Sequence, residues 1–92
     1  MGLKFTWNKG KASANLAKHG VSFEEAATVF ADPLSLTISD PDHSADETRF
    51  LIVGHSLYGH LLVVSHVERA DTIRIISARP ATRRERVTYE QE

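Results

Sequence analysis

The spacing of hydrophobic residues first indicates a helix near position 25. Four apolar residues recur at the i, i+3, i+4, i+7 spacing that places them on one helix face: Phe23, Ala26, Ala27 and Phe30. Ser22 and Glu25 have the spacing of a capping box, which predicts the start of this helix. The Asp32-Pro33 pair predicts its end, because the residue before a proline disfavours the helical conformation.

An earlier helix is predicted from the residues that begin and end it. Asn8 is a favourable N-cap, and the helix is expected to run to about Lys18. Gly20 fits the left-handed position that often follows a helix. Before this helix, polar and apolar residues alternate over positions 4–7, which predicts a short edge strand.

After the second helix the period changes to two, which is typical of strands. Strands are predicted over residues 34–38, 49–54, 60–67 and 72–78, with a polar loop over 39–46 and a hairpin loop over 56–59. Pro80 should end the sheet, because proline cannot continue a central ladder. Thr82 and Glu85 form a second capping box and predict a terminal helix reaching about Tyr89.

These elements predict an α+β fold with two N-terminal helices, an antiparallel β-meander and a C-terminal helix. The two periodicities also predict the core: Phe23, Phe30, Leu36, Ile52, Leu62, Val64, Ile73 and Ile75. With 92 residues, the chain has the size of one small domain, so residues 1–92 are expected to form a single unit.

The composition excludes several protein classes. The chain contains no cysteine, which excludes a disulfide scaffold and a thiolate metal site. The longest apolar run is Leu61–Val64, far short of the roughly 20 residues that span a membrane. The first residues lack the apolar stretch of a signal peptide, so we expect a cytoplasmic protein that does not enter the membrane.

Charge is strongly segregated along the chain. Residues 1–19 carry a net charge of +4, residues 20–48 carry −7, and residues 49–92 carry +2. Six arginines lie between Arg69 and Arg86, against only Asp71 and Glu85. Two interpretations remain open: these arginines pair with the acidic middle of the chain, or they form a phosphate-binding surface for nucleic acid.

The five histidines raise the possibility of a metal site. A short hairpin would place His55 and His60 opposite each other, but a zinc site needs a third ligand. His66 lies about 20 Å further along the strand. We therefore expect two neighbouring surface imidazoles and no bound metal or other cofactor. The contiguous Asp42-His43-Ser44 cannot form a hydrolase triad, because adjacent loop residues cannot align in one hydrogen-bonded chain.

Several blocks of the sequence together resemble the BrnT family. They are Phe5-Thr6-Trp7-Asn8, the Lys18–Ala26 block, Val29–Pro33, the Glu47-x-Arg49 pair and the block from Ile73 to Tyr89 that contains Ile76-Ser77-Ala78-Arg79. The resemblance implies a type II toxin with a RelE-like fold and metal-independent ribonuclease activity. It also implies a BrnA-like antitoxin with a ribbon-helix-helix region, through which the complex would bind operator DNA.

Metal-free RNA cleavage needs a base, an acid and cations near the phosphate. His19 or Glu47 is the candidate base, with Arg49 and Arg79 as the candidate cations. Further RNA-binding candidates are Lys18, His60, His66, Arg74, Arg83, Arg84 and Arg86. His66 is also an acid–base candidate, although a strand histidine fits the edge of the core equally well.

One position departs from the family pattern. Members of the BrnT family often carry arginine or lysine after the hairpin glycine, where this chain has His60. If this position contacts RNA, histidine predicts weaker or more pH-dependent activity. Two other classes of function also remain open: a nucleic-acid-binding module without catalysis, and an interaction domain whose acidic middle binds a basic partner.

Overall fold

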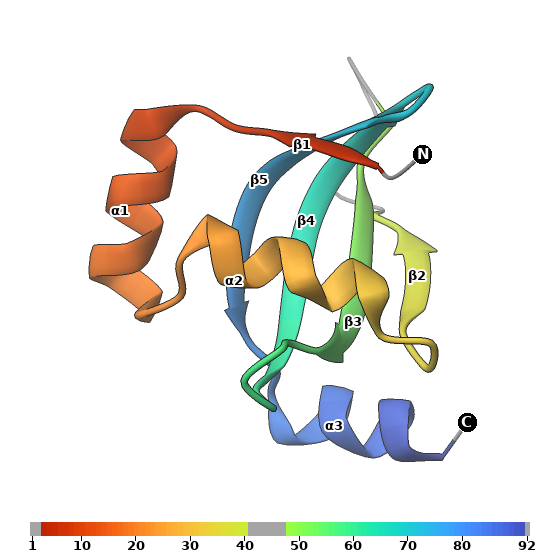
Figure 1. Ribbon diagram of the computed structural model, residues 1–92. Helices are drawn as coiled ribbons and strands as arrows, with labels where there is room; N and C mark the ends of the chain where they lie inside the picture. The colour runs from red at the N-terminus through yellow and green to blue at the C-terminus, as the bar shows by residue number, and fades with distance from the viewer. Residues whose placement is uncertain (1–2, 41–47, 92) are drawn as a thin grey trace.

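The computed structural model describes residues 3–40 and 48–91, which form three α-helices, a short 3-10 helix and five strands (Figure 1). In chain order the elements are β1 (Lys4–Thr6), α1 (Lys9–His19), α2 (Phe23–Thr28), η1 (Val29–Ala31), β2 (Leu36–Ser39), β3 (Phe50–His55), β4 (Leu61–Arg69), β5 (Thr72–Pro80) and α3 (Arg83–Glu90). The fold is therefore α+β, as predicted. None of these helices is long and apolar enough to cross a membrane. The predicted polar loop lies mostly outside the described residues, as does Asp42-His43-Ser44.

The five strands form one sheet in the order β1-β5-β4-β3-β2. Strands β2 to β5 make the predicted antiparallel meander. Strand β1 lies at the predicted edge, but it runs parallel to β5, with Phe5 opposite Ile73. The prediction of an antiparallel sheet is therefore confirmed for β2 to β5 and wrong for β1. Alternation of side chains identifies a strand, but it carries no information about the direction of a partner almost 70 residues away.

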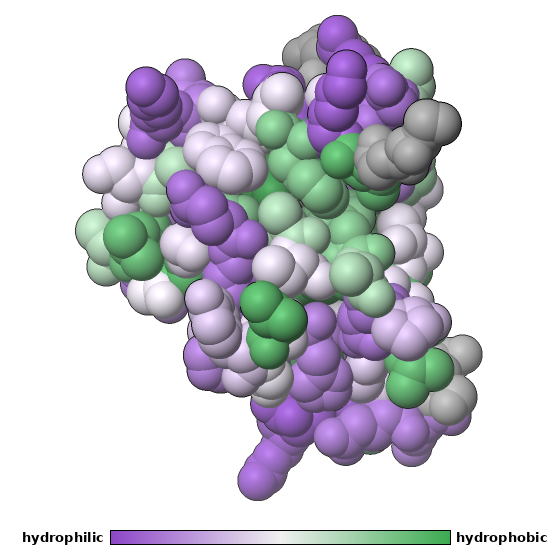
Figure 2. All heavy atoms as spheres, viewed as in Figure 1, coloured by the Kyte–Doolittle hydropathy of each residue, from purple (hydrophilic) through white to green (hydrophobic). Residues whose placement is uncertain are grey.

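Helix α2 lies across one face of the sheet, and α1 lies beside β5 at the edge of the sheet (Figure 1). The buried cluster contains six of the eight predicted core residues, Phe23, Ile52, Leu62, Val64, Ile73 and Ile75. Phe30 packs against this cluster but is only partly buried. In Figure 2, hydrophobic residues gather between β1 and α2, and hydrophilic residues cover α3 at the lower end.

The prediction that Leu36 belongs to this core was wrong. Leu36 pairs with Val53, and Val53 points away from α2 because its neighbour Ile52 points toward it. Both side chains line an apolar groove of about 250 Å³ between α3 and the opposite face of the sheet. A shift of one residue in strand register moves a side chain to the other face of the sheet. The alternating pattern of residues 34–38 does not indicate which of its two sides faces the main core.

The ends of the helices follow the predicted capping residues. The Asn8 side chain accepts a hydrogen bond from the Lys11 backbone N–H, and Gly20 closes α1 with a φ of 71°. The Thr82–Glu85 capping box at α3 is complete. At α2 only half of the predicted box forms: Ser22 accepts from the Glu25 N–H. The Glu25 carboxylate instead makes long-range contacts at one end of the sheet.

Asn15 joins α1 to the sheet, a role that the sequence pattern did not reveal. It is 7% exposed. Its side-chain amide donates to the carbonyl oxygens of Ala78 (2.8 Å) and Val21 (3.0 Å), and its oxygen accepts from the Ala78 N–H (3.1 Å). Strand β1 pairs with β5 only at residues 72–74. The Asn15 side chain therefore takes the place of a neighbouring strand at Ala78.

Candidate active site

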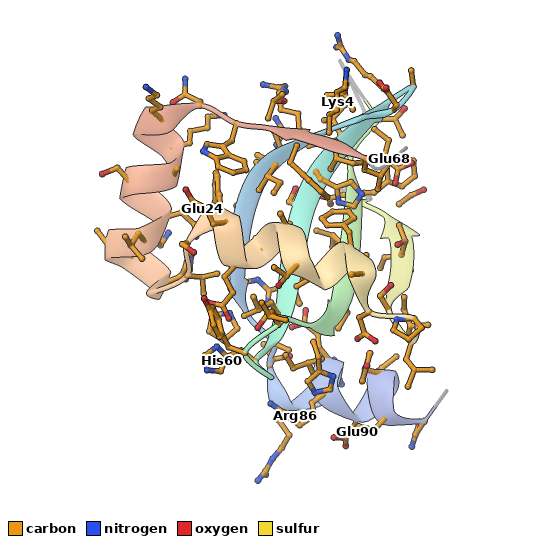
Figure 3. All side chains as sticks on the ribbon, viewed as in Figure 1. Lys4, Glu24, His60, Glu68, Arg86 and Glu90 are labelled. Carbon is orange, nitrogen blue, oxygen red and sulfur yellow. The ribbon has the colours of Figure 1, made fainter. Side chains whose placement is uncertain are left out.

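A cleft of about 340 Å³ opens at the hairpin end of the sheet. The C-terminal end of α1, the N-terminal part of α2, the β3–β4 hairpin and α3 each contribute to its walls. The polar side chains that line it are His19, Glu25, His60 and Arg86. Figure 3 shows His60 and Arg86 at this same end of the molecule. Three predicted site residues, His19, His60 and Arg86, therefore come together from distant parts of the chain.

Glu25 holds the imidazole of His60. The Glu25 side chain is 10% exposed, and its Oε2 lies 2.7 Å from His60 Nδ1. The same oxygen accepts a hydrogen bond from Ser56 Oγ at 2.7 Å. An ionised carboxylate can only accept hydrogen bonds, so the His60 tautomer that satisfies this contact carries its proton on Nδ1. The Nε2 atom of His60 is then the ring nitrogen that remains for other chemistry.

His19 lies at the last residue of α1, and Lys18 precedes it in the same turn. Two basic residues at this position are favourable, because the C-terminal end of a helix carries partial negative charge. The left-handed Gly20 turns the chain directly after His19, which places the imidazole at the cleft. Lys18 is exposed and is not one of the residues that line the cleft.

Arg79 lies outside this cleft and has its own partner. Its two terminal nitrogens donate to the two carboxylate oxygens of Glu85, both at 2.8 Å. Glu85 also accepts from the Thr82 backbone N–H. The Arg79 side chain is 38% exposed. This bidentate pair fixes the first turn of α3 to the end of β5, and so it helps to place Arg86 at the cleft.

Four basic residues lie on the sheet face opposite α2, which we call the basic face. Arg79 pairs with Val63, and Arg74 pairs with Val67 and Thr6. Side chains alternate along β4, so these positions share one face. The residues of the basic face are Lys4, Arg69, Arg74 and Arg79. Arg83 and Arg84 are exposed on the first turn of α3.

Arg49 is distant from the cleft. It precedes β3, whose first residue Phe50 pairs with His66, whereas the cleft is lined by Leu61 and Leu62 at the other end of β4. The separation along this strand is roughly 15–20 Å. The structure therefore does not gather His19, Arg49 and Arg79 in one site. Glu47 lies outside the described residues.

Residues 7–85 match the protein family described as ribonuclease toxin, BrnT, of type II toxin–antitoxin systems. The chain belongs to the BrnT family. The resemblance read from the sequence is confirmed. No curated protein sequence matches this BrnT-family chain.

The fold agrees with this membership. It is similar to the 1.1 Å crystal structure of the ribonuclease toxin BrnT from Brucella abortus, with a TM-score of 0.63 and 20% sequence identity. The similarity covers 88% of this chain and 99% of the Brucella abortus chain. At this identity the comparison establishes a shared fold, and the roles of individual residues must be argued from this chain's own contacts.

The structure contradicts a direct RNA contact for His66. Its side chain is 0% exposed and lies between Phe30 and Phe50, with ring centroids at 4.7 and 5.9 Å. Its Nε2 lies 3.1 Å from the Glu68 carboxylate. In this BrnT-family chain His66 is a core residue, and it lies where the pairing of β4 with β5 shifts register. A place in the core was the alternative interpretation of His66 in the sequence.

The predicted pairing of His55 with His60 was also wrong. His55 lies opposite Leu61, because the hairpin closes with His60 hydrogen-bonded to Ser56. The His55 ring instead contacts the Tyr89 hydroxyl, with 3.0 Å between Nδ1 and the hydroxyl oxygen. Among residues 3–40 and 48–91, no group of three histidine, aspartate or glutamate side chains is placed so that it could hold a metal ion.

Asp32, His55 and Tyr89 form a partly buried polar cluster that ties α3 to β3. The Tyr89 hydroxyl donates to Asp32 at 2.7 Å, and burial together with this bond raises the pKa of Tyr89 to about 12. Burial alone would raise the pKa of Asp32, but hydrogen bonds, first that from the His55 backbone N–H, outweigh it and lower that pKa. Through Tyr89, the cluster fixes the C-terminal half of α3 against the sheet.

The Arg79–Glu85 pair predicts an acid-sensitive contribution to stability. The hydrogen bonds from Arg79 lower the pKa of Glu85 from 4.5 to about 2. A carboxyl whose pKa is lower in the folded state stabilises the fold above its unfolded pKa and loses this effect as the pH falls. Because the pair is partly exposed, we expect roughly 1 kcal/mol, present above about pH 5 and lost toward pH 2. Thermal unfolding of wild type and Glu85→Gln across this range measures it.

The two proteins should differ most near neutral pH and converge toward pH 2. A constant difference in melting temperature at every pH would contradict a contribution from the ionised carboxylate.

Proposed function

We propose that this chain is the toxin of a type II toxin–antitoxin pair and a metal-independent endoribonuclease, and that it cleaves RNA in the cleft at the hairpin end of the sheet. The observation that carries this proposal is the meeting of two imidazoles and a guanidinium, from His19, His60 and Arg86, in one open cleft. Family membership supplies the reaction class. The cleft supplies the side chains that such a reaction needs.

The reaction needs no covalent group from the protein. The 2′-hydroxyl of the RNA attacks the adjacent phosphorus while a base takes its proton, and the 5′-oxygen leaves with a proton from an acid. The products are a 2′,3′-cyclic phosphate and a free 5′-hydroxyl. His19 and His60 serve as the base and the acid, and Arg86 stabilises the negative charge that builds on the phosphate oxygens.

The basic face and α3 provide a path for the rest of the RNA. Arg74, Arg79, Arg83 and Arg84 would contact backbone phosphates, which favours affinity without specifying a sequence. This surface also supports the second function considered above, nucleic-acid binding without catalysis. The two functions differ at the cleft, because binding alone does not require His19 or His60.

The proposal extends to the cellular context. A BrnA-like antitoxin with a ribbon-helix-helix region would neutralise the toxin, and the complex would bind operator DNA through the antitoxin alone. Toxin and antitoxin would meet in the cytoplasm, where the RNA substrate is found. The fold would be a variant of the RelE-like toxins.

We expect the purified chain to cleave RNA in EDTA at the same rate as in magnesium. Cationic side chains can take the charge-stabilising role that a metal ion has in other nucleases. Single-turnover cleavage of a radiolabelled RNA, followed by analysis of the product ends, tests both parts of the proposal. The products should carry cyclic phosphate ends.

The control is the same preparation bound to its antitoxin, which should be inactive. Loss of cleavage in EDTA with recovery in magnesium or manganese would overturn metal independence. RNA binding without any cleavage, in either condition, would favour the binding module.

A further inference from the structure

We infer that Glu25, with the help of Ser56, is the positioning residue that sets the orientation and tautomer of His60. This inference rests on the proposed function for the catalytic role of His60. The contact itself is a feature of the structure, so it can be tested without measuring cleavage. Nothing in the family match assigns a role to Glu25 or Ser56.

The Glu25 carboxylate bonds to the β3–β4 hairpin and not to its own helix. At the third residue of α2, a glutamate usually bonds back to the N-cap N–H and completes the capping box. Here Ser22 makes its half of the box, whereas Glu25 Oε2 accepts from Ser56 Oγ and His60 Nδ1, both at 2.7 Å. A carboxylate that is 10% exposed is costly to bury without such partners.

The backbone on either side of His60 is also fixed. The Ser56 N–H donates to the His60 carbonyl at 2.8 Å, and the Gly59 N–H donates to Ser56 at 2.9 Å. The turn needs glycine at position 59, where φ is 82°. Thr28 Oγ1 of α2 accepts from the Leu57 N–H at 2.8 Å. Helix α2 thus holds the hairpin, and the His60 ring is the part that Glu25 must fix.

The consequence for chemistry lies in the two ring nitrogens. A histidine that donates Nδ1–H to a carboxylate presents Nε2 as the atom that takes or gives a proton. The charged and titratable groups near this ring come from three elements: Glu25 of α2, His19 of α1 and Arg86 of α3. The Tyr58 ring lies 6.5 Å from the His60 ring. His60 itself is 65% exposed, so substrate can reach it.

The test uses Glu25→Gln, Ser56→Ala and His60→Ala in the full chain. Long-range 15N–1H spectra of the imidazoles should show the Nδ1–H tautomer of neutral His60 in the wild type and the loss of that preference in Glu25→Gln. Single-turnover RNA cleavage should fall roughly 10–100-fold in Glu25→Gln, the range for carboxylates that orient a metal-bound imidazole, with RNA affinity unchanged. Ser56→Ala should have a smaller effect in the same direction.

A double-mutant cycle separates positioning from simple destabilisation. If Glu25 acts through His60, then Glu25→Gln should cause no further loss of cleavage in the His60→Ala background. Glu24→Gln is the matched control, because Glu24 is the exposed neighbour of Glu25 on α2 and should behave as wild type in every measurement.

The possible failures are distinguishable. A wild-type His60 with an Nε2–H tautomer, or equal losses from Glu25→Gln in both backgrounds, would overturn the inference. A preparation that shows the Nδ1–H tautomer but cleaves no RNA would leave the inference standing and overturn the proposed function instead.

Discussion

The double variant His19→Gln, His60→Gln is expected to lose RNA cleavage by at least roughly 10⁴-fold while its RNA affinity stays close to that of the wild type. Each imidazole transfers a proton in the proposed reaction, and loss of one such group costs about 10²–10⁴-fold. In the proposed function most of the binding would come from the basic face and α3, which the double variant leaves intact. Single-turnover rates and RNA affinity on the same preparation measure the two effects separately.

His55→Gln is the control for this experiment. His55 lies on the same hairpin, but its ring contacts Tyr89 and takes no part in lining the cleft. It should lower stability slightly and leave cleavage near the wild-type rate. If the double variant cleaves normally and Arg74→Ala does not, the reaction takes place on the basic face and the cleft is not the active site.

Asn15→Leu is expected to destabilise the fold by about 3 kcal/mol. Leucine has a similar shape, but it cannot make the three hydrogen bonds that Asn15 makes to Ala78 and Val21. The Ala78 N–H and carbonyl would remain buried without partners, and each unsatisfied group costs roughly 1–3 kcal/mol. For a domain of this size the melting temperature should fall by roughly 15 °C. Urea unfolding gives the free energy directly.

Ser13→Ala tests whether the effect belongs to Asn15 rather than to α1 in general. Ser13 is exposed on the same helix, and its replacement should change the free energy of unfolding by less than about 0.5 kcal/mol. An Asn15→Leu variant within 1 kcal/mol of the wild type would show that the edge of β5 does not depend on this side chain.

Local patterns predicted most of the elements of this fold because their causes are local. Capping residues such as Asn8 and Thr82 act within one turn of the chain, and the apolar run Leu61–Val64 reflects burial on both faces of β4. The parallel direction of β1 and the face occupied by Leu36 depend on the packing of distant elements. No short stretch of sequence contains that information.

The residues of the candidate site also divide into those that the local sequence predicts and those that only the packing of distant elements reveals. His19 was a candidate base, and His60 and Arg86 were candidate RNA-binding residues; the fold brings all three to one cleft. Glu25 was missed as a functional residue because a capping box explained it fully at the local level. Only the structure shows that the Glu25 carboxylate bonds to Ser56 and His60 and does not complete the capping box. The role of Asn15 could not be predicted, because a single polar residue on a helix is common and its partner Ala78 is 63 residues away.

Arg79 illustrates a different limit. Arg79 was a candidate cation for the phosphate, and in the structure its guanidinium is bound to Glu85. The sequence pattern also contained Glu85, six residues further on, but Glu85 was assigned to the capping box. In the structure one carboxylate serves both the box and the guanidinium.

The pairing of β1 with β5 also delays the assembly of the proposed site during folding. Residues 4–6 pair with residues 72–74, and Asn15 of α1 bonds to Ala78, 63 residues further along the chain. Contacts between such distant positions form late in folding. The cleft combines His19 of α1 with Arg86 of α3, so we expect it to assemble only after the strands between these two helices have paired.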